Sequence, residues 1–395
     1  MNFTGSRESI TSGFRIVSHV VPSRSTRPIL SNILIRAQGN ELELAATDLD
    51  VGILHRVRGV EIEKPGTVLV PAQKIVTILS ELRSGDIAIE SDGKNLTVRT
   101  QNGIFRINGE TAENYPPMPD LATAVRELKD TGLSMSLNEF LAIVRKTLFA
   151  ASRERTRYAT NGVLFQIRKG ELRVVATDGK RLSLVTRKGL VAKASADALV
   201  PAATLEAFEK ICGGRETADA LEEGKEAKKA KPEDLVLHVE ERRISFLAAK
   251  DTLVFSKLVE GAFPKYEEVI PKKGDKIIAV PRDGLASVLR QAALMASDSA
   301  RSVRLTFADK KLRVSSQSSE YGDATVDLPL EYAGEKFEIR FDPDFLIDFL
   351  RVADAARVEF EFRDSTSAAI LRDGEGSARG GAAEHVYVVM PMGLT

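Results

Sequence analysis

Residues Leu172–Val185 read LRVVATDGKRLSLV, and this stretch predicts two short strands joined by a tight turn. Leu172, Val174 and Ala176 lie at every second position, as expected for one face of a strand. Asp178-Gly179 interrupts the alternation, and a glycine there tolerates the positive φ angle that hairpin turns need. Taken alone, the stretch indicates only a hairpin.

Two other stretches resemble this hairpin and lie at a similar spacing: LELAATDLDVGIL at 42–54 and LRVSSQSSEYGDATVDL at 312–328. Their first leucines are 130 residues (172 − 42) and 140 residues (312 − 172) from Leu172. Each hairpin follows a further strand and a segment with helical apolar periodicity, at Glu8–Val20, Leu137–Ala151 and Arg282–Ala296. The spacing indicates a repeated unit of the size of an ordinary domain.

A second landmark repeats in the same frame. Val70-Pro71, Val200-Pro201 and Asp342-Pro343 each precede a helical pattern, and proline is favoured in a first helical turn because its missing N–H would go unused there. These prolines are 130 (201 − 71) and 142 (343 − 201) residues apart. Because this period is too long for a solenoid, we predict an α+β fold with three tandem copies of one domain. Each copy reads helix, hairpin strands, helix and further strands.

Proline-rich stretches mark the predicted boundaries between the copies. YPPMP at 115–119 and FPKY at 263–266 break the regular patterns, so we expect domains over residues 1–125, 126–271 and 272–395. Residues 213–234 read GGRETADALEEGKEAKKAKPED and have no counterpart in the other copies. Their charge and lack of large apolar side chains predict an inserted, mobile surface loop that can include one helical turn.

Composition limits the class of protein further. Of 395 residues, 43% are apolar and 28% charged, which suits ordinary globular domains. A single cysteine, Cys212, excludes an intrachain disulfide, and no signal peptide or long apolar run is present. We therefore expect a cytoplasmic protein without a membrane span. The 56 basic and 56 acidic residues argue against a uniformly basic nucleic-acid binder but allow charge to be segregated onto separate surfaces.

The sequence offers no catalytic constellation. Neither glycine-rich phosphate-binding motif is present, and no metal-ligand spacing joins the scattered histidines His19, His55, His238 and His385. Asp48 and Asp50 lie in a predicted turn, where aspartate is a common turn former. We therefore expect no enzyme activity, no metal and no cofactor. The alternative, an enzyme such as a nuclease on a duplicated fold, is supported only by scattered acidic residues.

Five motifs follow one another along the chain: RPILSNILI at 27–35, NGVLF at 161–165, ATDGKRL at 176–182, SKLVEGAFPKYEEVIP at 256–271 and YVVMPM at 387–392. Together they resemble the bacterial DNA polymerase III beta subunit, the replicative sliding clamp. The resemblance covers nearly the whole chain apart from 213–234 and 374–384. It implies a head-to-tail homodimer in which two chains of three clamp domains close a six-domain ring. Such a ring encircles duplex DNA, independently of sequence, and tethers the replicative DNA polymerase.

The resemblance also implies residues for DNA contact and for ring closure. Contact with DNA is expected at Arg24 and Tyr158, with Arg27, Lys74, Arg153 and Arg157 as further candidates. The alternative for each basic residue is a solvated surface charge. The ring is expected to close through apolar contacts between two groups in different domains: Ile78, Leu82, Phe105 and Ile107 on one side, Leu294 and Met295 on the other.

A further implication is a pocket between the second and third domains that receives a short peptide from polymerases and the clamp loader. The matching residues are Thr177, Gly179, Arg181, Leu182, Pro264, Val269, Val388, Met390, Pro391 and Met392. An apolar slot with a few polar anchors suits a linear motif, and methionines adapt to several ligands. The alternative for Val388 and Met390 is a core position, because a period of two places both on one strand face.

Four residues depart from those found in some members of the family: Thr160, Glu268, Ala368 and Gly393. These departures leave the preferred partner motif open. Together with the insertion at 213–234, they motivate a second hypothesis, namely a clamp specialised away from replication, for example in repair.

Overall fold

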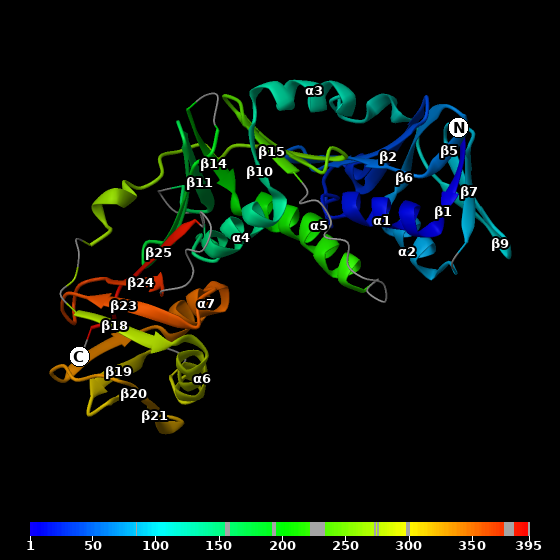
Figure 1. Ribbon diagram of the computed structural model, residues 1–395. Helices are drawn as coiled ribbons and strands as arrows, with labels where there is room; N and C mark the ends of the chain where they lie inside the picture. Colours follow the sequence, from blue (N-terminus) through cyan, green and yellow to red (C-terminus); the bar gives the residue numbers. More distant parts are fainter. Residues whose placement is uncertain are drawn as a thin grey trace. The chain divides into compact units, whose positions relative to one another are not determined.

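The computed structural model describes residues 1–83, 85–154, 159–191, 195–221, 234–271, 274, 276–297, 301–374 and 383–393. The chain divides into two compact units (Figure 1). The first unit contains Met1–Leu141, Val191–Ala194 and Ala203–Leu258. The second contains Ala142–Leu190, Ser195–Ala202 and Val259–Thr395.

The first unit contains two antiparallel sheets. Sheet A has the strand order β5 (Val60–Lys64), β1 (Asn2–Ser6), β7 (Asp86–Ser91), β8 (Asn95–Thr100) and β9 (Gly103–Asn108). Sheet B has eight strands, in the order β10 (Leu133–Ser136), β15 (Asp234–Val239), β16 (Arg243–Ala248), β17 (Thr252–Lys257), β4 (Val51–Val57), β3 (Glu41–Thr47), β2 (Asn32–Gln38) and β6 (Gly66–Pro71).

The second unit also contains two antiparallel sheets. Sheet C has the order β14 (Ala196–Pro201), β11 (Gly162–Arg168), β12 (Glu171–Thr177), β13 (Arg181–Lys188), β25 (Glu384–Val389), β24 (Ala369–Asp373), β23 (Arg357–Phe362) and β18 (Lys276–Pro281). Sheet D has the order β21 (Gly322–Pro329), β20 (Lys311–Ser318), β19 (Val303–Ala308) and β22 (Phe337–Phe341). Sheets B and C therefore each join strands from two successive repeats.

Three pairs of α-helices recur along the described chain: α1 (Arg7–Ser18) with α2 (Ala72–Glu81), α4 (Leu137–Leu148) with α5 (Ala202–Leu221), and α6 (Arg282–Ala293) with α7 (Pro343–Val352). The element order confirms the predicted threefold repetition of helix, hairpin strands, helix and further strands. Pro343 lies in the first turn of α7 as predicted, whereas Pro71 lies at the N-cap of α2, one residue before the helix begins. Short 3-10 helices cover Pro28–Ser31 (η1), Ala112–Asn114 (η2) and Tyr266–Glu268 (η3).

Two segments differ from the sequence-based expectation. Residues 213–221, predicted as the start of a surface loop, instead continue α5 to Leu221, because alanine, glutamate and leucine favour helix once a helix has begun. A further helix, α3 (Leu121–Thr131), covers residue 125, near which the first boundary was predicted. The Asp120 carboxylate caps α3 by accepting a bond from the Thr123 N–H at 2.7 Å. Residues 222–233 and 375–382 lie outside the described residues.

Helices cover both faces of sheet B. Leu121 and Leu128 of α3 are buried in an apolar cluster with Val236, Leu247 and Leu253 of the sheet. Figure 1 shows α1, α2 and α5 on the face opposite α3. On that opposite side, the rings of Phe140, Phe208 and Phe246 pack with centroids 5.2–5.6 Å apart. In the second unit, one large core is built from α6, α7 and strands of sheets C and D.

The predicted turn at 178–179 joins β12 to β13 through side-chain hydrogen bonds. The Thr177 hydroxyl donates to the Arg181 carbonyl at 2.6 Å, and the Asp178 carboxylate accepts from the Arg181 N–H at 3.0 Å. Gly179 lies between them with a φ of 87°. This left-handed conformation is available to glycine without steric cost.

The first repeat contains the same turn with a leucine in place of the glycine. The Thr47 hydroxyl donates to the Val51 carbonyl at 2.8 Å, and the Asp48 carboxylate accepts from the Val51 N–H at 2.7 Å. Leu49 lies at the position of Gly179 and has a φ of 82°. An L-residue with a Cβ is strained by about 1–2 kcal/mol in this region. The shared polar turn residues, rather than the glycine, therefore determine the turn.

We predict opposite effects on stability for matched substitutions in the two turns. Gly179→Ala should lower the free energy of unfolding by about 1 kcal/mol, purely through the backbone, because a Cβ at Gly179 meets nothing within 4 Å. Leu49→Gly should raise it by about 0.5 kcal/mol, because relief of strain exceeds the extra chain entropy of glycine. Urea titration measures both. Gly103→Ala, in a strand without positive φ, is the control, and an equal loss there would contradict the backbone account.

Candidate partner-binding site

The pairing of β13 with β25 joins the second repeat to the third in one sheet. Leu182 lies opposite Val388 in this antiparallel ladder. The Met390 N–H extends the ladder beyond β25 by donating to the Lys180 carbonyl at 2.9 Å. The ladder therefore reaches the Asp-Gly turn and brings two predicted pocket segments, 177–182 and 388–392, side by side.

An apolar cluster covers the face of sheet C that carries Leu182 and Val388. Its buried members are Val175, Leu182, Tyr266, Ile370, Val386 and Val388, and half-buried Leu164, Leu184, Phe263, Ile270 and Ala368 pack against them. Val388 is 4% exposed, as a core position would be, whereas Met390 is 49% exposed. Of these two residues, Met390 is the one that a ligand can reach.

Residues 263–270 form a strap over this cluster. Tyr266 is buried, and its hydroxyl donates to the Gln166 side-chain oxygen at 2.6 Å. Burial raises the pKa of Tyr266, so the phenol stays neutral and keeps donating. The predicted pocket residues Pro264 and Val269 flank Tyr266, and Val269 is 58% exposed. The strap thus presents an apolar side chain at the surface beside a fixed aromatic anchor.

The remaining predicted pocket residues lie around this cluster. Thr177 is buried in the turn, whereas Gly179 is exposed at its tip. Pro391 and Met392 are half-buried and follow β25, and the Met392 N–H donates to the Arg340 carbonyl of β22 at 2.9 Å. Together the described contacts place a solvent-accessible apolar surface at the junction of two repeats. We call this surface the slot; Met390 and Val269 are its accessible side chains, and Leu182 and Val388 are buried beneath them.

Arg181 was predicted as a polar pocket residue. In the structure its guanidinium is already bound by other groups of the protein. Its guanidinium forms ion pairs with Asp178 at 3.0 Å and Asp348 at 2.8 Å, and it donates to the Phe149 carbonyl at 2.9 Å. It also lies 4.5 Å above the centre of the Phe345 ring, and its side chain is 11% exposed. Arg181 therefore holds the turn against α7 and positions the slot.

A second polar group lies beneath the junction of β13 and β25. The Lys146 ammonium pairs with Asp373 at 3.1 Å and also with Asp354, and its side chain is only 10% exposed. The Ser183 hydroxyl donates to the Lys146 carbonyl and lies 2.9 Å from His385 Nε2. Burial lowers the pKa of His385 to about 3, and the positive charge of Lys146 acts in the same direction.

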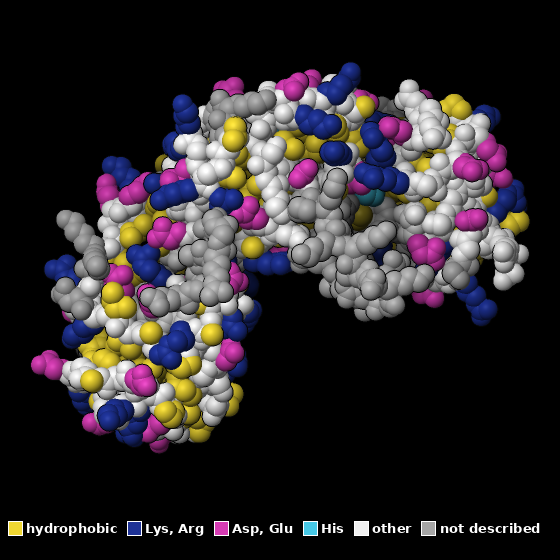
Figure 2. Space-filling view, in the orientation of Figure 1, with side chains coloured by type: hydrophobic (Ala, Val, Ile, Leu, Met, Phe, Trp, Pro, Cys, Tyr) yellow, Lys and Arg dark blue, Asp and Glu magenta, His cyan; other side chains and the backbone are white. Residues whose placement is uncertain are grey.

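The predicted DNA-contact residues are exposed where the structure describes them. Arg24 and Arg27 precede β2, Lys74 lies in the first turn of α2, and Arg153 follows α4. Arg157 and Tyr158 lie outside the described residues. On the face drawn in Figure 2, Lys and Arg side chains are interspersed with Asp and Glu. Exposure therefore fits both a phosphate contact and a solvated charge.

The structure adds a basic cleft that the sequence interpretation missed. A cavity of about 400 Å³ lies between α6 and α7 and is lined by Arg282, Asp283, Ala286, Arg290, Ile347, Leu350 and Arg351. The sequence contained a sign of this cleft. Ala286 and Arg290 are four residues apart, as are Ile347 and Arg351, and this spacing places each pair on one face of a helix.

The predicted ring-closure residues differ in accessibility. Leu294 is 78% exposed and Phe105 is 37% exposed, whereas Ile107 is 7% exposed; Ile78, Leu82 and Met295 are half-buried. The sequence interpretation missed Ile104, which is 51% exposed on β9, the edge strand of sheet A. Exposed apolar side chains on a strand edge are typical of a surface that another chain covers.

No described helix has the length and apolar character needed to cross a membrane. Within the same described ranges, no group of three or more His, Cys, Asp or Glu side chains is arranged to hold a metal ion.

Three family models match the chain in order. They are the N-terminal, central and C-terminal domains of the DNA polymerase III beta subunit, at residues 1–119, 134–265 and 267–392. The beta sliding clamp of Pseudomonas putida is 30% identical over 396 residues, and that of Escherichia coli K12 is 29% identical over 397 residues, with full coverage of both chains in each case.

Solved structures give the same relationship. The sliding clamp from Pseudomonas aeruginosa, in a structure bound to griselimycin, has a TM-score of 0.85 at 28% sequence identity and covers 100% of both chains. Three clamp domains of α+β fold in this order define the class of protein. The chain belongs to the bacterial DNA polymerase III beta subunit family, the beta sliding clamps. It has the sliding-clamp function and is a non-catalytic processivity subunit.

We predict that His385 makes the stability of the second unit fall with acid. The pKa of His385 in the folded state lies below the ordinary value of 6.5. As the pH falls below 6.5, His385 is therefore protonated in the unfolded chain but stays neutral in the folded chain. Because of this difference, the free energy of unfolding is unaffected by His385 above pH 6.5 and is lower by about 2 kcal/mol at pH 5. Urea titrations at pH 7.5 and 5 should show a shallower pH dependence for His385→Gln. An unchanged dependence would assign the acid sensitivity to other groups.

Proposed function

We propose that two copies of this chain close head to tail into a ring of six clamp domains around duplex DNA. The ring tethers the replicative DNA polymerase, the clamp loader and other proteins with a clamp-binding motif, in the cytoplasm. The observation that carries this proposal is the threefold repeat with an accessible apolar slot where β13 meets β25. Domain boundaries near residues 125 and 271 belong to the same proposal.

Contact with DNA in this proposal is electrostatic and independent of sequence. Among the described residues, the side chains of Arg24, Arg27, Lys74 and Arg153 form no ion pair, so their charge is available to phosphates. The cleft between α6 and α7 supplies further arginines in the third repeat. A ring held by topology needs only a diffuse positive potential, because phosphate contacts carry no sequence information. Arg157 and Tyr158 complete the proposed set.

Ring closure in this proposal covers apolar side chains that a single chain leaves exposed. Phe105 and Ile104 on β9 belong to the first repeat, and Leu294 after α6 belongs to the third. A contact between unlike surfaces closes a ring only when the rotation fits, and three domains in each chain make two copies sufficient. Ile78, Leu82, Ile107 and Met295 are the proposed neighbours.

The slot of sheet C is the proposed receptor for partner peptides. Met390 and Val269 supply accessible apolar contacts, while buried Leu182 and Val388 form the floor. Thr177 and Arg181 support the slot by fixing the turn, and Gly179 forms its tip. The remaining proposed lining residues are Pro264, Pro391 and Met392. At the rim, Glu268 lies 3.7 Å from Lys265, which places a paired rather than a lone charge beside the slot.

Retention on DNA tests the ring. After loading by a clamp loader, the protein should stay on a nicked circular plasmid through gel filtration and be lost when a restriction enzyme linearises the plasmid, because topology alone holds it. By light scattering, the protein should have twice the 43.1 kDa mass of one chain. Leu294→Asp should give a monomer that is not retained on the circle. Equal retention on linear and circular DNA would contradict topological binding.

A charged substitution in the slot should separate partner binding from ring formation. We predict that Met390→Asp leaves the dimer mass unchanged. It should reduce stimulation of the replicative polymerase at least tenfold, because the apolar motif of a partner would have to desolvate a carboxylate. Product length on a primed single-stranded circle measures the stimulation. The control is Val191→Asp, since Val191 is exposed, at 82%, and lies outside the proposed lining. If Met390→Asp gave products of normal length, the slot would be excluded as the binding site for the polymerase.

A specialised clamp is the second candidate, and the departures at Thr160, Glu268, Ala368 and Gly393 favour it. The same experiments distinguish the two candidates. A wild-type ring that is retained on DNA but does not lengthen the products of the replicative polymerase would indicate a role outside replication.

A further inference from the structure

Helix α3 and sheet B enclose a small cavity on the first unit, far along the chain from the proposed slot. The cavity has a volume of about 190 Å³, which is below the 300–1,000 Å³ typical of pockets for whole small ligands. Its lining residues come from the segment 119–131 and from β15, β16 and β17. The family models match residues 1–119 and 134–265, so α3 lies in the interval between the two matches.

The floor of the cavity is apolar. Leu128 of α3 and Leu253 of β17 are 5% and 2% exposed, and Phe255 lies beside them. On sheet B, Val236, Leu247 and Leu253 lie opposite one another on three adjacent strands and form an apolar row beneath α3. This surface suits the methylene stem of a side chain.

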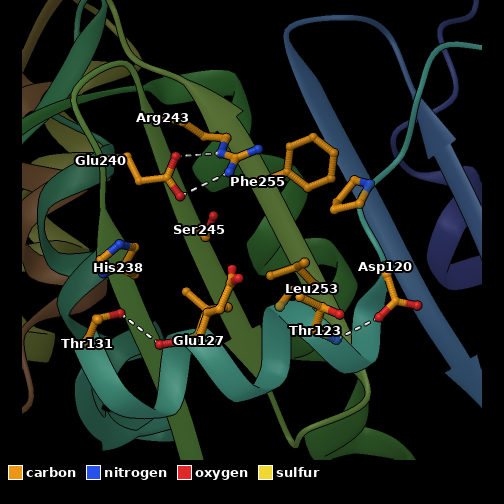
Figure 3. Close-up of a pocket in the computed structure, with 13 residues that line it drawn as sticks. Asp120, Thr123, Glu127, Thr131, His238, Glu240, Arg243, Ser245, Leu253 and Phe255 are labelled. Atoms are coloured by element: carbon orange, nitrogen blue, oxygen red, sulfur yellow. Dashed lines mark hydrogen bonds and ion pairs between the residues drawn. The ribbon is translucent and has the colours of Figure 1, made fainter.

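The next row across the strands is polar. His238, Ser245 and Phe255 lie opposite one another on β15, β16 and β17. Figure 3 shows Glu127 extending from α3 toward this row. Within the described ranges, the carboxylate of Glu127, the ring of His238 and the hydroxyl of Ser245 form no hydrogen bond or ion pair, although Ser245 is only 5% exposed. Ser245 lines the cavity, so a ligand there can supply the hydrogen-bond partner that the described side chains do not give its hydroxyl.

The charges around the cavity favour a cation. Its lining holds three carboxylates, those of Asp120, Glu127 and Glu240, and one guanidinium, that of Arg243. Arg243 is already paired with Glu240 through two bonds of 3.0 and 3.2 Å and lies 5.8 Å from the centre of the Phe255 ring. The Asp120 carboxylate caps α3. Glu127 therefore remains as the unneutralised charge that faces the cavity.

We propose that this cavity receives one arginine side chain presented by a partner protein. The stem of the arginine packs on Leu128 and Leu253, and its guanidinium donates to the Glu127 carboxylate and to Ser245. A planar guanidinium has five donors, so it reaches several acceptors at once, which an ammonium point charge does less well. Glu127, Glu240 and Arg243 are exposed at the rim, so the backbone that carries the arginine can pass over the opening. The lining of this cavity shares no residue with the slot or with the proposed ring-closure residues.

Methyl NMR on the full-length protein labelled at leucine methyl groups tests the proposal. The probe is the capped pentapeptide acetyl-Gly-Ser-Arg-Ser-Gly-amide, and the matched control peptide carries citrulline, which has nearly the same shape without the charge. The arginine peptide should shift the methyl resonances of Leu128 and Leu253 and bind at least tenfold more tightly than the citrulline peptide.

Matched variants locate the interaction. Glu127→Gln should weaken binding of the arginine peptide at least tenfold, whereas Glu113→Gln, an exposed change elsewhere in the same unit, should leave it unchanged. Because both residues are exposed, both variants should keep the wild-type methyl spectrum without peptide. The proposed site would be wrong if Glu127→Gln bound the arginine peptide as tightly as the wild type. It would also be wrong if the peptide left the methyl resonances of both Leu128 and Leu253 unchanged. Tighter binding of free L-arginine than of the peptide would overturn the assignment to a partner protein.

Discussion

Hydrogen bonding between edge strands of successive repeats is the interaction on which the rest of each unit depends. β4 pairs with β17 in sheet B, and β13 pairs with β25 in sheet C. An unpaired edge would expose a row of N–H and C=O groups to other chains. Each pairing removes two such edges and continues one apolar face across two repeats. The slot in sheet C is therefore a property of the junction, and no single repeat contains it.

Charged side chains reinforce the junction in sheet C. Arg181 contacts Asp348, and Lys146 contacts Asp354 and Asp373. Ion pairs with little exposure contribute little net stability compared with apolar packing, because desolvation offsets the attraction, but removing one partner leaves a costly unpaired charge. The pairs connect β13 and α4 of the second repeat to α7, Asp354 and β24 of the third repeat. A slip of one residue would move each side chain of the slot floor to the opposite face of the sheet.

The features that local sequence determines were predictable. The turn at 178–179 depends on neighbours within four residues, and the same is true of its copy with Leu49 in the first repeat. The threefold order of elements followed from the same local patterns. Helix α3 also had a local signal, an aspartate at the N-cap followed by apolar residues at Leu121 and Leu128, but it was missed because it has no counterpart in the other repeats.

The contacts that determine the site were not accessible from sequence patterns. Leu182 meets Val388 across more than two hundred residues of chain, and only the resemblance to a family linked the two. Arg181 was assigned to the pocket only through the family resemblance, and nothing near it in sequence indicates its contacts with Asp348 and Phe345. The cavity under α3 combines three strands with a helix from a distant segment. Strand alternation predicts which side chains share a face, but not which faces meet.

The proposed ring explains why modest interactions suffice for a protein of this class. A partner engaged on the same DNA as the ring is present at an effective concentration in the millimolar range, so a weak contact at the slot is enough to hold it and still allows exchange. A weak interaction is also enough for DNA, because the closed ring keeps the DNA in place without tight binding. The electrostatic attraction between the ring and the DNA therefore needs only to be diffuse. A chain with 56 basic and 56 acidic residues meets that requirement when the basic side chains lie where the DNA passes. In the proposed ring, the apolar slot selects the partners, while the exposed basic side chains determine where the DNA lies.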